Sequence, residues 1–177
     1  RRAPNRRLFG ANGYTHADPN SYLVLVRSDD QGKTWSAVPE HIFAHPLGGS
    51  QDPCMVMLRN GTIVLTSYAW TVVPESEATK AKKVLRVFDS WAFLPLGGYL
   101  LRSRDLGGTW EGPFIPPEFE DDTRWIDYVA KPALNRGAMV QGSDGLLYWA
   151  VVRTPQQLQH TMLELLVSSD EGETWEH

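Results

Sequence analysis

One eight-residue pattern occurs three times in this sequence and constrains the fold more than any other feature. The pattern is Ser-x-Asp-x-Gly-x-Thr-Trp, and its copies occupy residues 28–35, 103–110 and 168–175. Because five fixed positions recur three times at similar spacing, the pattern marks an internal repeat and not a chance match. The chain is therefore expected to contain repeated structural units of one kind.

Each fixed position of the pattern suits a tight β-hairpin turn. The aspartate can accept hydrogen bonds from backbone N–H groups two or three residues on, and the glycine adopts the positive φ that such a turn needs. The tryptophan begins the returning strand and offers a large apolar surface for packing. We therefore predict that Asp30, Asp105 and Asp170 hold turns together and take no part in catalysis. We also predict strands on both sides of each copy and a largely buried tryptophan in all three.

The pattern resembles the Asp-box, also called the bacterial neuraminidase (BNR) repeat, of the sialidase superfamily. The resemblance implies an all-β fold, a β-propeller with blades of four antiparallel strands. Such propellers usually have six blades in that superfamily, and each box joins the third strand of a blade to the fourth. Because the sequence between the boxes also has the pattern of blade strands, residues 1–177 are expected to form one partial propeller domain.

Apolar alternation and turn signals predict the strands. Residues 21–28 alternate and lead into the first box. The dipeptide at residues 60–61 is Asn-Gly between two apolar runs, which is a strong hairpin signal. Residues 75–83 are charged and could form either a short helix or a loop insertion, of which we favour the loop. Strand signals resume at residues 98–103, before the second box.

The third unit has the same layout, with a hairpin expected across residues 142–145 before the last box. The strands amount to two nearly whole blades and part of another, whereas a closed propeller needs about four to eight blades. We therefore expect the ring to be completed by a longer polypeptide or by additional copies of the chain.

Composition narrows the range of partners and cofactors. The net charge of −4 argues against a nucleic acid held by a general positive field. The sequence contains no run of about eighteen apolar residues, so no transmembrane helix is expected. We find no glycine-rich phosphate loop, no cluster with metal-ligand spacing and no Gly-x-Ser-x-Gly motif, so no cofactor and no metal are expected. The resemblance favours a secreted or periplasmic protein.

The resemblance also predicts where a site would lie. Sialidase-like sites open around the propeller axis, on the face opposite the boxes. The loops expected on that face span residues 14–20, 44–52, 70–96, 117–136 and 153–160. Sialidases use three arginines to bind the sugar carboxylate, a Tyr–Glu pair as nucleophile and an aspartate as acid/base. Arginine suits the first task because its guanidinium group binds a carboxylate bidentately.

Three residues are the main site candidates. Asp52 lies in an Asp-Pro dipeptide that precedes a strand and a Gly-Thr hairpin, an order similar to that of Asp-box glycosidase-like proteins. The resemblance places Asp52 at the inner rim of the propeller and makes it the acid/base candidate. A turn-initiating Asp-Pro is the alternative. Arg153 ends an apolar strand where a clamp arginine is expected, and Arg136 with Arg153 would suit an anionic ligand. Salt bridges to the acids of residues 120–122 are the alternative for the arginines. We predict that the three side chains converge opposite the boxes, with the two arginines as near neighbours.

Two further residues are weaker candidates for substrate binding. His16 matches a histidine that such proteins often carry before the first box, with a hydrogen-bonded loop residue as the alternative. Trp125 lies on a predicted site-facing loop and could stack on a sugar ring. The sequence also departs from the family, because residues 136–137 hold no acid where the helper glutamate is expected. The tyrosine nucleophile and the last clamp arginine would lie beyond residue 177.

The sequence thus predicts a sialidase-like glycoside hydrolase that acts on glycans, with terminal sialic or other acidic sugars as candidate substrates. The expected acid/base is Asp52, and the expected sugar contacts are Arg136, Arg153, His16 and Trp125. The alternative is a non-catalytic Asp-box propeller that binds carbohydrate or protein, which the missing glutamate favours.

Overall fold

The protein is all-β in the part of the chain that the structure describes. The structure is a computed structural model, and it describes residues 18–177 apart from residues 81–85, 89–90, 123–131, 138 and 158–159. These residues form ten strands and one short 3-10 helix, and all strand pairs are antiparallel. The predicted fold class, all-β with antiparallel strands, is confirmed. The described residues form no closed ring.

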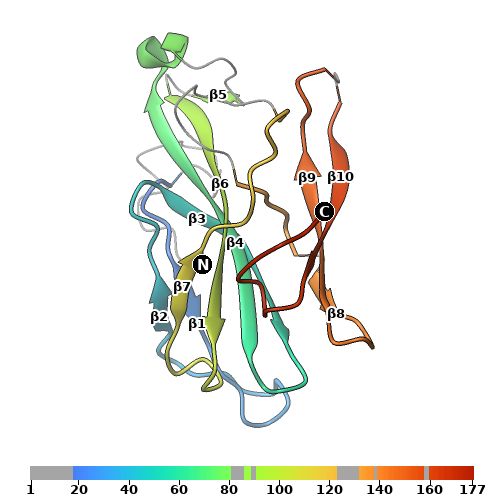
Figure 1. Cartoon of the computed structure of the whole chain (residues 1–177). Coiled ribbons are helices and arrows are strands. Elements are labelled where there is room, and N and C mark those ends of the chain that lie inside the picture. Colours follow the sequence, from blue (N-terminus) through green and yellow to red (C-terminus); the bar gives the residue numbers. More distant parts are fainter. Residues whose placement is uncertain (1–17, 81–85, 89–90, 123–131, 138, 158–159) are drawn as a thin grey trace.

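Three antiparallel sheets follow one another along the chain (Figure 1). The first sheet pairs β1 (Leu23–Leu25) with β2 (Glu40–Phe43). The middle sheet contains β3 (Gly49–Met57), β4 (Ile63–Pro74), β6 (Trp91–Ser103), β5 (Arg86–Phe88) and β7 (Glu111–Phe114). The third sheet contains β8 (Met139–Gln141), β9 (Leu147–Arg153) and β10 (Met162–Ser168).

Every box occupies the same place in its sheet. The first box joins β1 to β2, and the second joins β6 to β7. The third box follows β10, and the chain then returns to it through a bridge between Val167 and Glu176. Strand pairing on both sides of each box is therefore present, as predicted.

The three boxes share one network of hydrogen bonds. In each box the serine hydroxyl donates to the aspartate Oδ1 at 2.8 Å and accepts a bond from the glycine N–H. The aspartate also accepts bonds from the threonine N–H and hydroxyl, four residues on. In the third box it accepts a further bond from the Glu173 N–H, three residues on, as predicted. The glycine φ is +85° or +86° in all three, and the residue before it also has a positive φ. The aspartates therefore act as turn anchors.

The described residues form two apolar core clusters, one on each face of the middle sheet. Alternate residues of β6 point to opposite faces, so Tyr99 and Leu101 pack with Leu23 of the first sheet. Leu100 points the other way and packs with Trp149 of the third sheet. The middle sheet is thus sandwiched between the other two, as Figure 1 shows.

The burial of the box tryptophans departs from expectation. Trp110 packs against the cluster between the first and middle sheets, and Trp175 packs against the cluster between the middle and third sheets. Trp35 is 60% exposed. The prediction that all three are largely buried is wrong for Trp35, because the described residues place no sheet on that side of the first one.

Element boundaries also differ in places. The predicted hairpins at residues 60–61 and 142–145 are confirmed by β3–β4 and β8–β9. β6 begins at Trp91 and not at residue 98, because it continues its pairing with β4 through a bulge near Trp70. The favoured loop insertion is wrong at Glu75–Lys80, which forms the 3-10 helix η2. Among the described residues, no helix is long and apolar enough to cross a membrane.

The buried box serines should contribute more to stability than Ser28 of the first box, which is only partly buried. Ser103 is fully buried and accepts a hydrogen bond from the buried Gly107 N–H at 2.7 Å. Ser103→Ala should lower the free energy of unfolding by about 1–3 kcal/mol, because it leaves that donor unpaired. Ser28→Ala removes the same bond at an exposed turn, where water can replace it, and should cost less. Urea unfolding of both variants measures the difference; equal losses would contradict this account.

The boxes should also make stability depend on acid pH. Hydrogen bonds from the Thr34 N–H, the Thr34 hydroxyl and Ser28 lower the pKa of Asp30 to about 2, and the equivalent bonds lower the pKa of Asp105 to about 2. Because an unfolded aspartate has a pKa of about 3.9, the boxes stabilise the fold fully above that pH. This stabilisation is lost as the pH falls through about 2.

Asp105→Asn should therefore reduce the loss of stability between about pH 4 and pH 2. Urea midpoints measured across that range test the expectation. The control is Asp29→Asn, which replaces an exposed aspartate in the first box outside the fixed positions. An Asp105→Asn variant with the acid dependence of the unmodified protein would refute the assignment.

Candidate functional site

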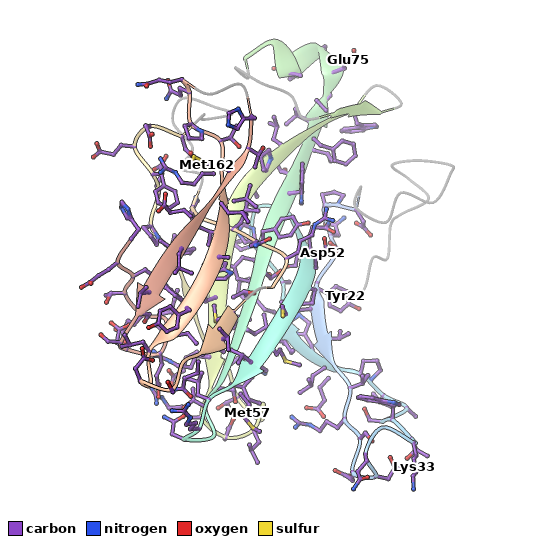
Figure 2. All side chains as sticks on the ribbon, turned by 90° about the vertical axis from the view of Figure 1, so that its right-hand side faces the viewer. Tyr22, Lys33, Asp52, Met57, Glu75 and Met162 are labelled. Carbon is purple, nitrogen blue, oxygen red and sulfur yellow. The ribbon has the colours of Figure 1, made fainter. Side chains whose placement is uncertain are left out.

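Asp52 lies at an irregular point of β3. The pairing of β3 with β4 shifts register between Gln51 and Cys54, so Asp52 and Pro53 form a bulge. Asp52 has a φ of +36°, which is strained for a residue other than glycine. Figure 2 shows Asp52 far from Lys33, which marks the tip of the first box. The bulge turns the side chain out of the regular strand alternation.

Asp52, Tyr68 and Arg136 form one cluster, called the Asp52 cluster below. The Tyr68 hydroxyl donates to Asp52 Oδ2 at 2.6 Å. Arg136 Nε lies 3.1 Å from the same carboxylate oxygen and 3.2 Å from the Tyr68 hydroxyl oxygen. β4 supplies Tyr68, and Arg136 follows the bridge between Leu134 and Val152. The contact brings together two of the three main site candidates, Asp52 and Arg136.

Burial divides the Asp52 cluster into a buried part and an accessible part. Tyr68 is 2% exposed, whereas the side chains of Asp52 and Arg136 are 32% and 66% exposed. Burial and the hydrogen bond to Asp52 raise the pKa of Tyr68, so its hydroxyl keeps its proton and acts as a donor. The hydrogen bond to Tyr68 raises the pKa of Arg136. The cluster therefore presents a carboxylate and a guanidinium group on a buried phenol.

Tyr68 is a member of the cluster that the sequence analysis missed. It lies in an apolar run, where tyrosine is a common core residue. The Asn-Gly turn could have identified it, because counting back from that turn pairs Tyr68 with Asp52, although the bulge makes Gln51 the observed partner.

Arg153 belongs to a different network. It forms salt bridges with Asp121, with Asp122 at 3.5 Å and with Glu164 at 2.9 Å, and its guanidinium carbon lies 4.3 Å from the Phe119 ring centre. Burial lowers the pKa of Arg153, but the hydrogen bond to Glu164 and the charges of Asp121 and Asp122 raise it overall. The salt-bridge alternative is therefore present for this arginine.

The predicted site residues thus have different places in the structure. Asp52 and Arg136 contact each other, while Arg153 engages its own set of acids. His16 and Trp125 lie outside the described residues.

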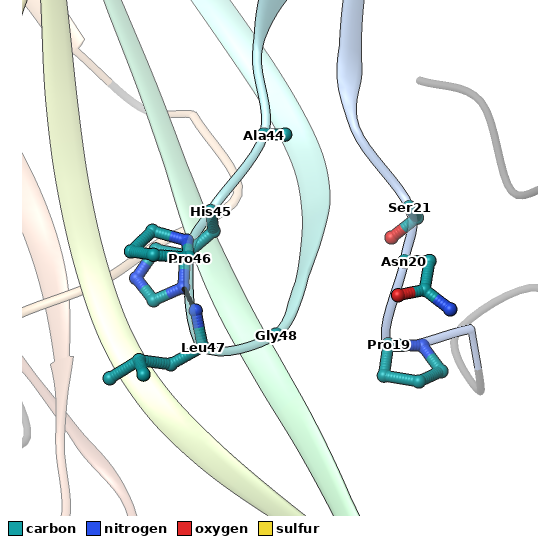
Figure 3. Close-up of a pocket in the computed structure, with 8 residues that line it drawn as sticks. All are labelled: Pro19, Asn20, Ser21, Ala44, His45, Pro46, Leu47 and Gly48. Carbon is teal, nitrogen blue, oxygen red and sulfur yellow. Dashed lines mark hydrogen bonds between the residues drawn. The ribbon is translucent and has the colours of Figure 1, made fainter.

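A small pocket lies between residues 19–21 and residues 44–48 (Figure 3). Its lining includes His45, whose Nδ1 accepts a hydrogen bond from the Leu47 N–H at 3.2 Å. Burial lowers the pKa of His45, so the imidazole is neutral near pH 7. Among the described residues, the lining holds neither an acid nor a lysine or arginine. These lining residues therefore do not provide the charged groups that distinguish the Asp52 cluster.

Comparisons with known proteins point to a repeat family and to a similar solved structure. The profile of the BNR/Asp-box repeat matches residues 26–37, which include the first box, and supports placing the chain with BNR-repeat proteins. No curated protein matches the chain. A crystal structure of a protein of unknown function from Dyadobacter fermentans DSM 18053 is similar, with 46% identity and a TM-score of 0.83. The similarity covers 99% of this chain and 48% of that protein, so the chain spans about half its length.

The network around Arg153 should be structural. Asp122 is 3% exposed, and Arg153→Ala would leave it buried without its arginine. The free energy of unfolding should fall by about 3 kcal/mol, as for a broken buried ion pair. The matched control is Arg104→Ala, which removes a side chain that is 52% exposed and should cost less than about 1 kcal/mol. Similar small losses in both variants, measured by urea unfolding, would disprove a structural role.

Proposed function

We propose that this chain is part of a sialidase-like β-propeller that acts on glycans as a glycoside hydrolase. The three sheets correspond to successive blades, and the rest of the ring comes from a longer polypeptide or from additional copies. Two observations support this arrangement: each box follows a strand and is followed by antiparallel pairing, a strand after the first two boxes and a bridge after the third, and successive sheets pack face to face around two apolar clusters.

The Asp52 cluster carries the proposal about chemistry. A bulged, strained aspartate with a buried tyrosine and an accessible arginine is unusual as pure packing, since strained backbone concentrates at functional sites. In a glycosidase, Asp52 transfers the proton at the scissile bond. Arg136 binds the carboxylate or another anionic group of an acidic sugar through the outer part of its guanidinium group.

Tyr68 supports this chemistry without contacting the sugar. It is buried, and its hydroxyl donates to the carboxylate, so it fixes the rotamer of Asp52. Because burial raises the pKa of Tyr68, the phenol is a poor nucleophile in this setting. We therefore assign Tyr68 to positioning.

A non-catalytic function is the second candidate, namely a propeller that binds carbohydrate or protein. The observation that favours it is that Arg153 is already engaged in salt bridges within the protein. Three acids surround this arginine, and the chain holds no acid at residues 136–137. In this case the Asp52 cluster binds a glycan without cleaving it.

The two functions differ in the effect of one substitution in the full-length protein. Asp52→Asn should lower turnover of a responsive fluorogenic glycoside by at least about 100-fold, the range for a lost general acid or base. The control is Asp144→Asn, because Asp144 also accepts a tyrosine hydroxyl, from Tyr148 at 2.5 Å, but lies in the β8–β9 turn. It should leave turnover unchanged.

A panel of acidic and neutral glycosides identifies the substrate. If no glycoside is cleaved but a glycan array is bound, and if Asp52→Asn weakens that binding, the binding function replaces the hydrolase. If Asp52→Asn changes neither turnover nor binding while the fold is intact, the Asp52 cluster is not the site.

A further inference from the structure

The first sheet exposes a face that its two counterparts bury. When the three units are aligned on their boxes, Val26 corresponds to Leu101 and Leu166, and Trp35 corresponds to Trp110 and Trp175. Leu101 and Leu166 are 2% and 0% exposed, whereas Val26 is 40% and Trp35 is 60% exposed. We call Val26, Gly32 and Trp35 the open face of the first sheet. Because the three units share one pattern, we expect a further structural element to pack on this face.

The cover of the other two boxes has a defined chemistry. In the second box, Gly107 is covered by Leu25 of the first sheet: a Cβ built at Gly107 would lie 3.0 Å from Leu25 Cδ2. In the third box, Gly172 is covered in the same way by Leu100 of the middle sheet: a Cβ built at Gly172 would lie 3.4 Å from Leu100 Cδ2. Each time, a leucine of the preceding sheet packs on the glycine of the next box.

An arginine two residues after each leucine makes a second contact. Arg27 Nη1 donates to the backbone carbonyl of Leu106 at 2.7 Å, and Arg102 Nη1 donates to that of Asp170 at 3.2 Å. Both acceptors belong to the box of the next sheet. The preceding sheet therefore recognises a box with a Leu-x-Arg strand, through one apolar contact and one charge-assisted hydrogen bond.

We propose that the open face of the first sheet binds a further antiparallel sheet, carried by the same polypeptide, that presents a Leu-x-Arg strand. Its leucine packs on Gly32 beside Trp35, and its arginine donates to a backbone carbonyl of the first box. The first sheet then gains the contact that the middle and third sheets already have.

The sequence of the third sheet argues against a second copy as the occupant. Its outer face carries Leu163 and Leu165, which are 65% and 51% exposed, so it could supply the leucine. At the arginine position it has Val167, so a second copy docked through this sheet would lack the hydrogen bond to the box. The similar protein, which is about twice as long, shows that a chain of this kind can continue in one polypeptide.

Oxidative footprinting of the full-length protein with peptide mass spectrometry tests the proposal. Trp35 should be protected to the same degree as Trp110 and Trp175, which serve as internal references for packed box tryptophans. Met57, which is 65% exposed, provides the reference for a side chain in water. If Trp35 reacts as an exposed tryptophan, the open face is unoccupied and the proposal fails.

Photo-crosslinking identifies the occupant and its source. A photoreactive phenylalanine analogue at position 35 should crosslink to a strand of the same polypeptide that contains Leu-x-Arg. The same analogue at position 47, where Leu47 is 70% exposed and lines the pocket at residues 44–48, is the control. Mixed light and heavy isotope preparations separate crosslinks within one chain from those between copies. A crosslink between copies, to another protein or to a strand without Leu-x-Arg would overturn the proposal. These outcomes do not depend on glycan chemistry, so they test the surface independently of the proposed activity.

Discussion

The hydrogen bonds to the box aspartate are the interaction on which the rest of the structure depends. One carboxylate gathers the serine hydroxyl, the threonine N–H and the threonine hydroxyl, and so fixes two consecutive residues at positive φ. That reversal brings the glycine under the tryptophan ring, since a Cβ built at Gly107 would lie 3.6 Å from Trp110. Because the glycine and tryptophan then form the surface that receives the preceding sheet, a short polar turn determines how large apolar layers stack.

Much of the fold could be predicted because the repeat is local. The pattern determined the turns, the antiparallel pairing and the structural role of the aspartates, since these depend on residues within one hairpin. Trp35 could not be predicted, because its burial depends on a neighbouring sheet and not on its own box. The early start of β6 was missed because Pro95 and Gly97 interrupt its pattern, while pairing with β4 keeps it extended.

The candidate site was predictable only in part, for a similar physical reason. Asp52 was singled out from its Asp-Pro dipeptide, whereas its direct contact with Arg136 was not predicted. Tyr68 was missed because its role arises from the register of β3 on β4, which an apolar run does not reveal. For Arg153 the prediction and the structure differ. Its position at the end of a strand suggested binding of a ligand carboxylate, but its guanidinium group forms salt bridges with Asp121 and Asp122.

The link from Arg27 and Arg102 to the following box has a consequence for biosynthesis. Each arginine and its leucine precede, in the chain, the box that they contact. A nascent chain that leaves the ribosome therefore presents each new box to a sheet that has already been made, and folding can advance in the direction of translation. The two hydrogen bonds join residues that are 79 and 68 positions apart, so each sheet must wait for most of the next unit to be made before the contact can close.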